Sequence, residues 1–254
     1  MKTGSYSHAA YDFIRKAILN GAYKPGQALP EAEIAQKSGV SRTPVREALR
    51  QLESEGLITI RANAGAKVKA VTLKEYRETT ELRQALEATA AGLAAQNRTD
   101  EELEAIRIPL EKLTRATEAL VREDHEKPDL VKEVVEEDVR FHLAIILAAG
   151  NDLLKKEIMR LHLIQKVVTN IHPEMARLHP AGADKAKRDA WRAESLAFHR
   201  NIFEAIRDRD AAKAKRVMEQ HLQLVIDLNL LAMARAKNSS RTQGLSPEDM
   251  EYLA

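Results

Sequence analysis

The chain has 254 residues, of which 44% are hydrophobic and 31% charged, and it contains no cysteine. This composition is typical of a soluble globular protein with one large or two small domains, and it excludes a disulfide framework. Without cysteine, any metal ion has to be held by histidines and carboxylates. No apolar run approaches the ~20 residues of a membrane span, and residues 1–11 lack the apolar core of a signal peptide. We therefore expect a cytoplasmic protein with no membrane partner.

The net charge of +2 is unevenly distributed along the chain. Residues 1–72 carry eleven basic and six acidic side chains, a net charge of +5, which leaves −3 for the remainder. A basic segment before an acidic one is typical of a nucleic-acid-binding module joined to a second domain, although a solvated basic face would give the same count.

The first 72 residues are expected to form three helices and a hairpin. Helices are predicted over 11–20, 31–37 and 41–55, and each ends at or shortly before a glycine. β-branched and alternating residues predict strands over 57–60 and 67–71, with a turn at 63–65. This order of elements is that of a winged helix-turn-helix, which we assign to residues 1–72.

Strand signals disappear after Val71, and helical periodicity replaces them. Further helices are predicted over 72–97, about 103–120, 129–149, 152–170, 184–207 and 210–234. Pro109 is expected to kink or break the second of these. The buried side of the first is predicted to consist of Leu82, Leu86, Thr89 and Leu93.

The predicted fold is therefore mainly α, with an N-terminal winged helix-turn-helix followed by an all-α antiparallel helical bundle. The bundle, over 73–234, is the candidate metal- and effector-binding domain. A polar tail over 235–254 is expected to be disordered, with one short helix able to start at Ser246.

The turn between the second and third predicted helices meets the steric requirements of a helix-turn-helix. Ala35 is small where two helices approach, Gly39 allows a positive φ, and Val45 supplies an apolar contact. The third helix would then be the one that enters the DNA major groove.

The predicted recognition helix has one cationic and one apolar face. Arg42, Arg46 and Arg50 recur at four-residue intervals and share a face. The free amides of the first turn, which contains Ser41 and Thr43, favour a phosphate or a base edge together with these guanidinium groups. A solvated arginine face on an ordinary helix is the alternative, but the hairpin tip, where Gly65 allows close approach to a minor groove, favours DNA binding.

Four residues of the helical part are candidates for a metal site. Asp138 and His142 share one face of a predicted helix, and His199 and His221 lie on the apolar sides of two later helices, equidistant from Asp210. In an antiparallel hairpin the two later histidines would stand at the same height. Three imidazoles and a carboxylate suit a divalent metal, with zinc preferred and nickel or manganese as alternatives. Each histidine alone could instead be a hydrogen-bonded core residue.

Two other kinds of protein are compatible with such a metal site. A metal with histidine ligands and open positions could activate water in a helical enzyme that acts on a small organic acid. Against an enzyme, the chain has no HExxH, no pair of ExxH motifs and no nucleophile elbow. The other alternative is a helical scaffold whose histidines only pack in the core. Metal analysis of the purified protein would distinguish this scaffold, because it would hold no metal.

Residues 29–57, LPEAEIAQKSGVSRTPVREALRQLESEGL, resemble the winged-helix reader of the GntR family of transcription regulators. The resemblance extends to about residue 232, as the FadR subgroup with its FCD ligand-binding domain. It implies DNA contacts for Arg42, Thr43, Arg46 and Gly65. This chain departs from some members in carrying Glu31 to Glu33 before the turn and Ala64 beside the wing glycine.

The same resemblance implies a function for the helical part. The pattern of Asp138, His142, His199 and His221 looks like the metal set of FCD domains. The resemblance implies that Arg83 binds the carboxylate of a small organic acid effector. Without the resemblance, an ion pair between Arg83 and Glu87 is an equally good explanation of this residue. The implied protein is a homodimeric regulator, not an enzyme, that binds a near-palindromic double-stranded DNA operator, with repression relieved by the effector.

Overall fold

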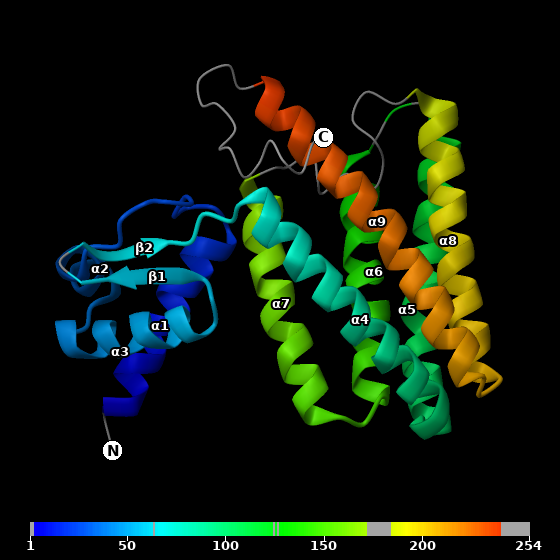
Figure 1. The fold of residues 1–254 in the computed structure, drawn as a ribbon, viewed down its shortest axis with the longest axis horizontal. Helices are drawn as coiled ribbons and strands as arrows, with labels where there is room; N and C mark the ends of the chain where they lie inside the picture. Colours follow the sequence, from blue (N-terminus) through cyan, green and yellow to red (C-terminus); the bar gives the residue numbers. More distant parts are fainter. Residues whose placement is uncertain (1–2, 63, 124, 126, 172–183, 240–254) are drawn as a thin grey trace. The chain divides into compact units, whose positions relative to one another are not determined.

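The structure, a computed structural model, describes residues 3–62, 64–123, 125, 127–171 and 184–239. The chain forms two compact units (Figure 1). The first unit contains the described residues up to Tyr76 and the part of helix α7 from Met159 onward, and the second contains the others. Among the described residues, none of the helices combines the length and apolar character needed to cross a membrane.

The first unit is a winged helix-turn-helix, as predicted. Its elements are α1 (Thr3–Leu19), α2 (Glu31–Ser38), α3 (Arg42–Ser54), β1 (Ile58–Arg61) and β2 (Gly65–Val68). Helix α1 begins well before the predicted start at 11. The sequence did not indicate this first stretch, because its residues are polar and carry no periodic apolar signal.

The core of the first unit holds α1, α2 and α3 together. The residues predicted to shape the turn behave as expected: Gly39 has φ of 71° and ends α2, and Val45 is fully buried. The largest fully buried side chains of this core are Ile14, Ile18, Ile34, Leu52, Leu57 and Ile58. Their burial fixes the angle between α2 and α3, and therefore fixes which face of α3 is exposed.

The wing is a short antiparallel hairpin in which Ile58 pairs with Val68 and Arg61 pairs with Gly65. The second strand was predicted over 67–71, but the ladder runs from Gly65 to Val68. Gly65 has φ of 72°, so it combines the conformation of a turn residue with a place in the ladder. Asn63, part of the predicted turn, lies outside the described residues.

The second unit is all helical, which confirms the predicted fold class (Figure 1). Its helices are α5 (Asp100–Arg122), α6 (Pro128–Ala148), α8 (Lys185–Arg207) and α9 (Ala211–Ser239), together with most of α4 (Leu73–Asn97) and the part of α7 (Asp152–Ile171) before Met159. Helix α5 packs against α6 and α8, and α8 packs against α9. The last helix includes the first residues of the tail expected from 235 on, and residues 240–254, with the helix expected at Ser246, lie outside the described residues.

The buried side of α4 differs from the prediction. Leu82 is 48% exposed, and the core side consists of Ala88, Ala91, Ala94 and Ala95. The prediction followed the largest apolar side chains, whereas small alanines let neighbouring helices approach closely along this face. The start of α4 was predicted correctly, since Thr72 and Glu75 cap each other's backbone amides at 3.1 and 3.0 Å.

Pro109 does not break α5, which runs without interruption from Asp100 to Arg122. Its ring is buried among the apolar residues of the core, so packing offsets the lost backbone hydrogen bond.

The turn between α8 and α9 is anchored to the end of α4. Arg209 has φ of 58°, and its guanidinium donates to the carbonyl oxygens of Gln96 and Arg98 at 3.0 and 3.2 Å. These contacts satisfy carbonyls that a helix end leaves free. They hold α8 and α9 as an antiparallel pair against α4.

Candidate metal centre and nucleic-acid interface

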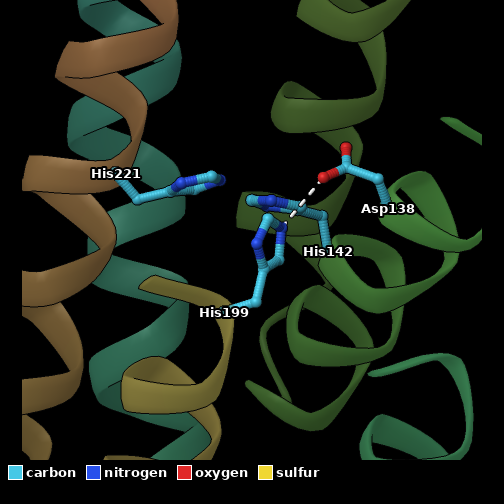
Figure 2. Close-up of side chains that lie close together, drawn as sticks. All are labelled: Asp138, His142, His199 and His221. Carbon is cyan, nitrogen blue, oxygen red and sulfur yellow. Dashed lines mark hydrogen bonds and ion pairs between the residues drawn. The ribbon is translucent and has the colours of Figure 1, made fainter. Parts of the chain in front are cut away.

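The four predicted metal ligands converge inside the second unit. Helix α6 supplies Asp138 and His142, α8 supplies His199, and α9 supplies His221 (Figure 2). One candidate ligand atom from each lies within 4.8 Å of those of the others. The three histidines are between 1% and 5% exposed, so the cluster is an interior feature.

The hydrogen bonds of His199 leave a lone pair directed at a carboxylate. Its Nδ1 lies 2.7 Å from the carbonyl oxygen of Ser195, which can only accept, so Nδ1 carries the proton. Its Nε2 lies 2.9 Å from Oδ1 of Asp138. In a neutral imidazole this arrangement sets a lone pair against an anionic oxygen, which is favourable only if a proton or a cation lies with them.

His142 is oriented by a carboxylate that the sequence interpretation treated only as a partner of Arg83. Its Nδ1 lies 3.0 Å from Oε2 of Glu87, which is 1% exposed. A carboxylate accepts, so Nδ1 donates and Nε2 keeps its lone pair. Burial lowers the pKa of His142, but the bond to Glu87 outweighs burial and raises this pKa above its usual value.

His221 remains neutral because of its surroundings. Burial and the nearby His199 and His142 hold the pKa of His221 well below its usual value. Its Nδ1 is buried and has no hydrogen-bond partner among the described residues. A neutral buried imidazole with an orphaned nitrogen is suited to be a ligand, since an unsatisfied buried polar atom is otherwise costly.

Asp138 supplies the negative charge of the cluster. Burial alone would raise the pKa of Asp138, but the hydrogen bond and charge interaction with His199 hold it well below its usual value. A cation bound by Asp138 and the imidazole nitrogens would take the place of the proton that the contact between His199 and Asp138 requires. These residues fit a borderline divalent cation.

Arg83 does not reach this cluster directly. Its Nε donates to Oε1 of Glu87 at 2.5 Å, and its side chain is 12% exposed. The ion pair that the sequence allowed as an alternative is therefore formed, and it connects Arg83 to His142 through a single carboxylate.

A cavity adjoins the metal cluster on the side of Asp138 and His199. It is small, with about 20 Å³ of space that the centre of a water molecule can occupy. Trp191, Arg192 and Thr117 line it together with apolar side chains, and Arg83 is not among its lining residues.

The recognition helix α3 has the two faces that the sequence predicted. Ser41, Arg42, Thr43, Arg46 and Arg50 are all exposed. The opposite face is buried and consists of Pro44, Val45, Ala48, Leu49 and Leu52. Ser41 is the N-cap and makes no side-chain capping bond, so its hydroxyl leaves the first amides of α3 available to another acceptor.

Two details of the first unit concern DNA contact. Nε of Arg46 donates to Oε2 of Glu31 at 2.7 Å in an exposed ion pair. Gly65 is exposed at the wing, and open space surrounds the position where a side chain would start. Its positive φ, rather than crowding, therefore requires glycine there.

Comparison with known proteins agrees with both units. Residues 78–224 match the FCD domain family, and residues 6–68 match the gntR family of bacterial regulatory proteins. The chain belongs to the GntR family, in the subgroup with an FCD domain. It is a DNA-binding transcriptional regulator, so the alternatives of an enzyme and of a scaffold are not retained.

The relatives of this GntR-family chain are regulators too. The Uxu operon transcriptional regulator of Escherichia coli is 31% identical over 245 residues, which cover 89% of this chain and 88% of the relative. The regulator YdhC of Bacillus subtilis is 31% identical over 212 residues, covering 83% and 85%. The solved structure of E. coli McbR/YncC has the same fold, with a TM-score of 0.65, 23% identity, and coverage of 91% of this chain and 98% of that one.

Two general properties of the family bear on the arginine face of α3 and on the metal cluster. GntR regulators bind DNA operators and small-molecule effectors, generally as dimers. Some FCD domains bind metals, and this chain brings an Asp and three histidines together.

Sequence reasoning missed Glu87 as a partner of His142, and it missed the cavity residues Trp191 and Arg192. Position 87 offered one usable signal, since a carboxylate beside the alanine face of α4 needs a buried partner. No periodic signal distinguishes Trp191 from an ordinary core aromatic.

Proposed function

We propose that this GntR-family regulator is a repressor whose affinity for a near-palindromic operator is controlled by a small organic acid bound at a metal centre. The observation that carries this proposal is the buried convergence of Asp138, His142, His199 and His221 in a chain that also exposes an arginine face on a helix-turn-helix. A homodimer would place two α3 helices in successive major grooves.

In this proposal the four converging residues hold a divalent metal, zinc before nickel or manganese. When bound, the metal supplies a positive centre that attracts the carboxylate of an acid. The protein holds the imidazoles in the correct tautomer, through the Ser195 carbonyl for His199 and through Glu87 for His142. The metal would replace the contact between Nε2 of His199 and Oδ1 of Asp138, while the bonds to Ser195 and Glu87 would remain.

Arg83 is proposed to engage the acid. A guanidinium has five N–H donors, and Glu87 occupies the Nε donor of Arg83. Because Glu87 also bonds to His142, a carboxylate that binds Arg83 acts on the same network that orients a metal ligand. Ligand and metal would therefore favour each other's binding.

On DNA, the proposed contacts are those of α3 and the wing. Arg42, Arg46 and Arg50 would reach base edges or phosphates, Ser41 and Thr43 would meet the backbone at the helix start, and Gly65 would allow the wing to approach the minor groove. We propose that the dimer has two arrangements of its winged helices and that the acid binds one of them more tightly. The largest change in operator affinity that the acid can cause is set by the ratio of its affinities for the two arrangements.

Selection of bound duplexes from a random pool tests this proposal. The purified chain, loaded with zinc, is expected to enrich a near-palindromic site, and candidate hydroxy acids or sugar acids are expected to weaken its binding. The variant Arg42→Ala should lose the enrichment while keeping its zinc. Enrichment that is absent for the zinc-loaded chain, or that is indifferent to every acid and to zinc removal, would contradict the proposal.

A further inference from the structure

The wing has one buried face and one exposed face. Residues directly opposite each other in a ladder share a face, and so do residues two apart along a strand. The pairs of Thr59 with Lys67 and of Arg61 with Gly65 therefore belong to one face, and all four residues are exposed. The buried residues of the other face are Ile58, Ala66 and Val68. The exposed face thus carries two cationic side chains.

All charged side chains of the wing are positive. Residues 57–71 contain Arg61, Lys67 and Lys69 and no aspartate or glutamate. Lys69 is paired, since its Nζ lies 3.1 Å from Oε1 of Glu75. Among the described residues, Arg61 and Lys67 have no carboxylate partner. An exposed cation is ordinarily only solvated, so the shape of the wing has to decide whether these two meet a partner.

The described part of the wing tip is slender and has a single long side chain, that of Arg61. The other described residues there are Ala62, Ala64 and Gly65, all of them exposed. Gly65 lies directly opposite Arg61, and open space surrounds the position where its side chain would start. A minor groove is only about 6 Å wide, so it admits a slender tip with one extended cation. Where the groove is narrow its negative potential is enhanced, and this potential attracts arginine.

The wing is held at both of its edges. On one edge the segment 26–29 pairs with β2, and the amide of Leu29 donates to the carbonyl oxygen of Ala66 at 2.8 Å. On the other edge the amide of Ile60 donates at 2.8 Å to Oε1 of Glu53, a residue of α3. These bonds fix the wing relative to the recognition helix before DNA binds, which reduces the entropy lost on binding.

We propose that Arg61 enters the minor groove beside the bases read by α3 and selects A·T pairs there, while Lys67 contacts a phosphate. This inference rests on the proposed function, which brings the wing to the minor groove, and adds the side chain that reads it and the bases that are read. A G·C pair presents an amino group in the minor groove, whereas an A·T pair does not, and tracts of A·T pairs have a narrow groove. Arginine suits this groove better than lysine, because a guanidinium is more weakly hydrated than an ammonium.

Selection from a random pool tests the base preference. The zinc-loaded parent chain and zinc-loaded Arg61→Ala select duplexes side by side. The parent is expected to enrich A·T pairs next to the positions read by α3, and Arg61→Ala is expected to enrich the same central site without them. Flanking pairs that are the same in both selected pools would overturn the inference.

Base substitution in the selected duplex separates a minor-groove contact from a backbone contact. Three duplexes carry A·T, G·C or inosine·C pairs at the flanking positions, and inosine lacks the amino group that guanine presents in the minor groove. Fluorescence anisotropy is expected to show that the parent binds the A·T and inosine·C duplexes roughly fivefold to tenfold more tightly than the G·C duplex. Equal affinity for all three duplexes would contradict readout in the minor groove.

Variants of exposed residues assign the contacts. Arg61→Ala should bind all three duplexes as the parent binds the G·C duplex, and Arg61→Lys, which keeps the charge, should lose most of the preference. Lys67→Ala should weaken binding to all three duplexes equally and lower the slope of log affinity against log salt by about 1. Arg107→Ala, an exposed arginine of α5, is the control and should match the parent. A full preference for A·T pairs in Arg61→Ala would refute the assignment.

The response to acids, measured on the same duplexes, separates this inference from the proposed function. A preference for A·T pairs that depends on Arg61, in a chain whose DNA affinity no acid changes, supports the inference and contradicts the proposed control by an acid. Acid-sensitive binding to a site without any preference that depends on Arg61 supports that control and overturns the inference.

Discussion

The Nδ1 atom of His142 lies 3.0 Å from Oε2 of Glu87, and both side chains are almost completely buried. This bond joins α6 to α4 and fixes which imidazole nitrogen is free to bind a metal. We predict that Glu87→Gln lowers zinc affinity by roughly 10- to 100-fold, because a neutral amide orients the ring less firmly and makes it less basic. Competition with a zinc chelator measures this affinity.

The control for that variant is Glu81→Gln on the same helix. Glu81 is exposed and pairs with Arg77. The zinc affinity of the Glu81→Gln variant is expected to equal that of the parent chain. Equal affinities in all three proteins would show that Glu87 does not position His142 for a metal.

Zinc is expected to stabilise the second unit against unfolding. A ligand at 100 times its Kd adds about 2.7 kcal/mol to the free energy of unfolding, which raises Tm by several degrees. The rise should disappear in His221→Ala and persist in His8→Ala, since His8 is an exposed residue of α1. Calorimetric scans of the chelated and zinc-loaded proteins check this prediction. A zinc effect that survives in His221→Ala would place the metal elsewhere.

Arg46→Ala is expected to weaken specific DNA binding. An arginine that bonds a guanine with two hydrogen bonds contributes ~1–3 kcal/mol, or about 5- to 150-fold in affinity. Fluorescence anisotropy with a selected duplex measures the loss. Arg107→Ala, which removes an exposed arginine of α5, is the matched control and should leave DNA binding unchanged. Equal losses in both variants would point to charge alone.

Glu31 is expected to compete with DNA for Arg46. The two side chains form an exposed ion pair at 2.7 Å, and such pairs contribute only ~0.2–1 kcal/mol. Glu31→Gln releases Arg46 and removes a negative charge near the phosphates, so affinity should rise by up to about fivefold. The gain should shrink as salt is added. Weaker binding in this variant would show that Glu31 helps to place Arg46 for its DNA contact.

Tyr11 gives the first unit a pH dependence in the alkaline range. Its hydroxyl lies 2.9 Å from both oxygens of Glu55, and burial, followed by this hydrogen bond, raises the pKa of Tyr11 from 10.0 to about 12. A raised pKa stabilises the fold below pH 10, and this stabilisation is lost as the pH rises toward 12. In an absorbance titration one of the five tyrosines should ionise late, and Tyr11→Phe should remove that step. An unchanged titration in the variant would disprove the assignment.

Much of the fold follows from patterns that act over a few residues. The exposed Arg42, Arg46 and Arg50 and the buried face behind them depend on helical period alone, and the structure has them as predicted. The convergence of His199 and His221 was also predictable, because both are equidistant from the turn at Asp210.

Other features depend on packing between distant segments, which periodicity within one helix does not indicate. The buried face of α4 was predicted wrongly because large apolar residues were favoured over alanines, whose small size allows close helix contact. The bond from Glu87 to His142 joins residues 55 positions apart, so periodicity within one helix cannot indicate it. The cavity at Trp191 likewise requires α5, α6 and α8 to be in place.

The most direct test of the account compares operator affinity in the zinc-loaded parent chain and in zinc-treated His199→Ala, each with and without an effective acid. The account predicts that the acid changes the parent's affinity at least tenfold and leaves that of His199→Ala unchanged, while both proteins bind the operator without acid. An acid response of the same size in both proteins would contradict the claim that the buried cluster controls the DNA-reading helix.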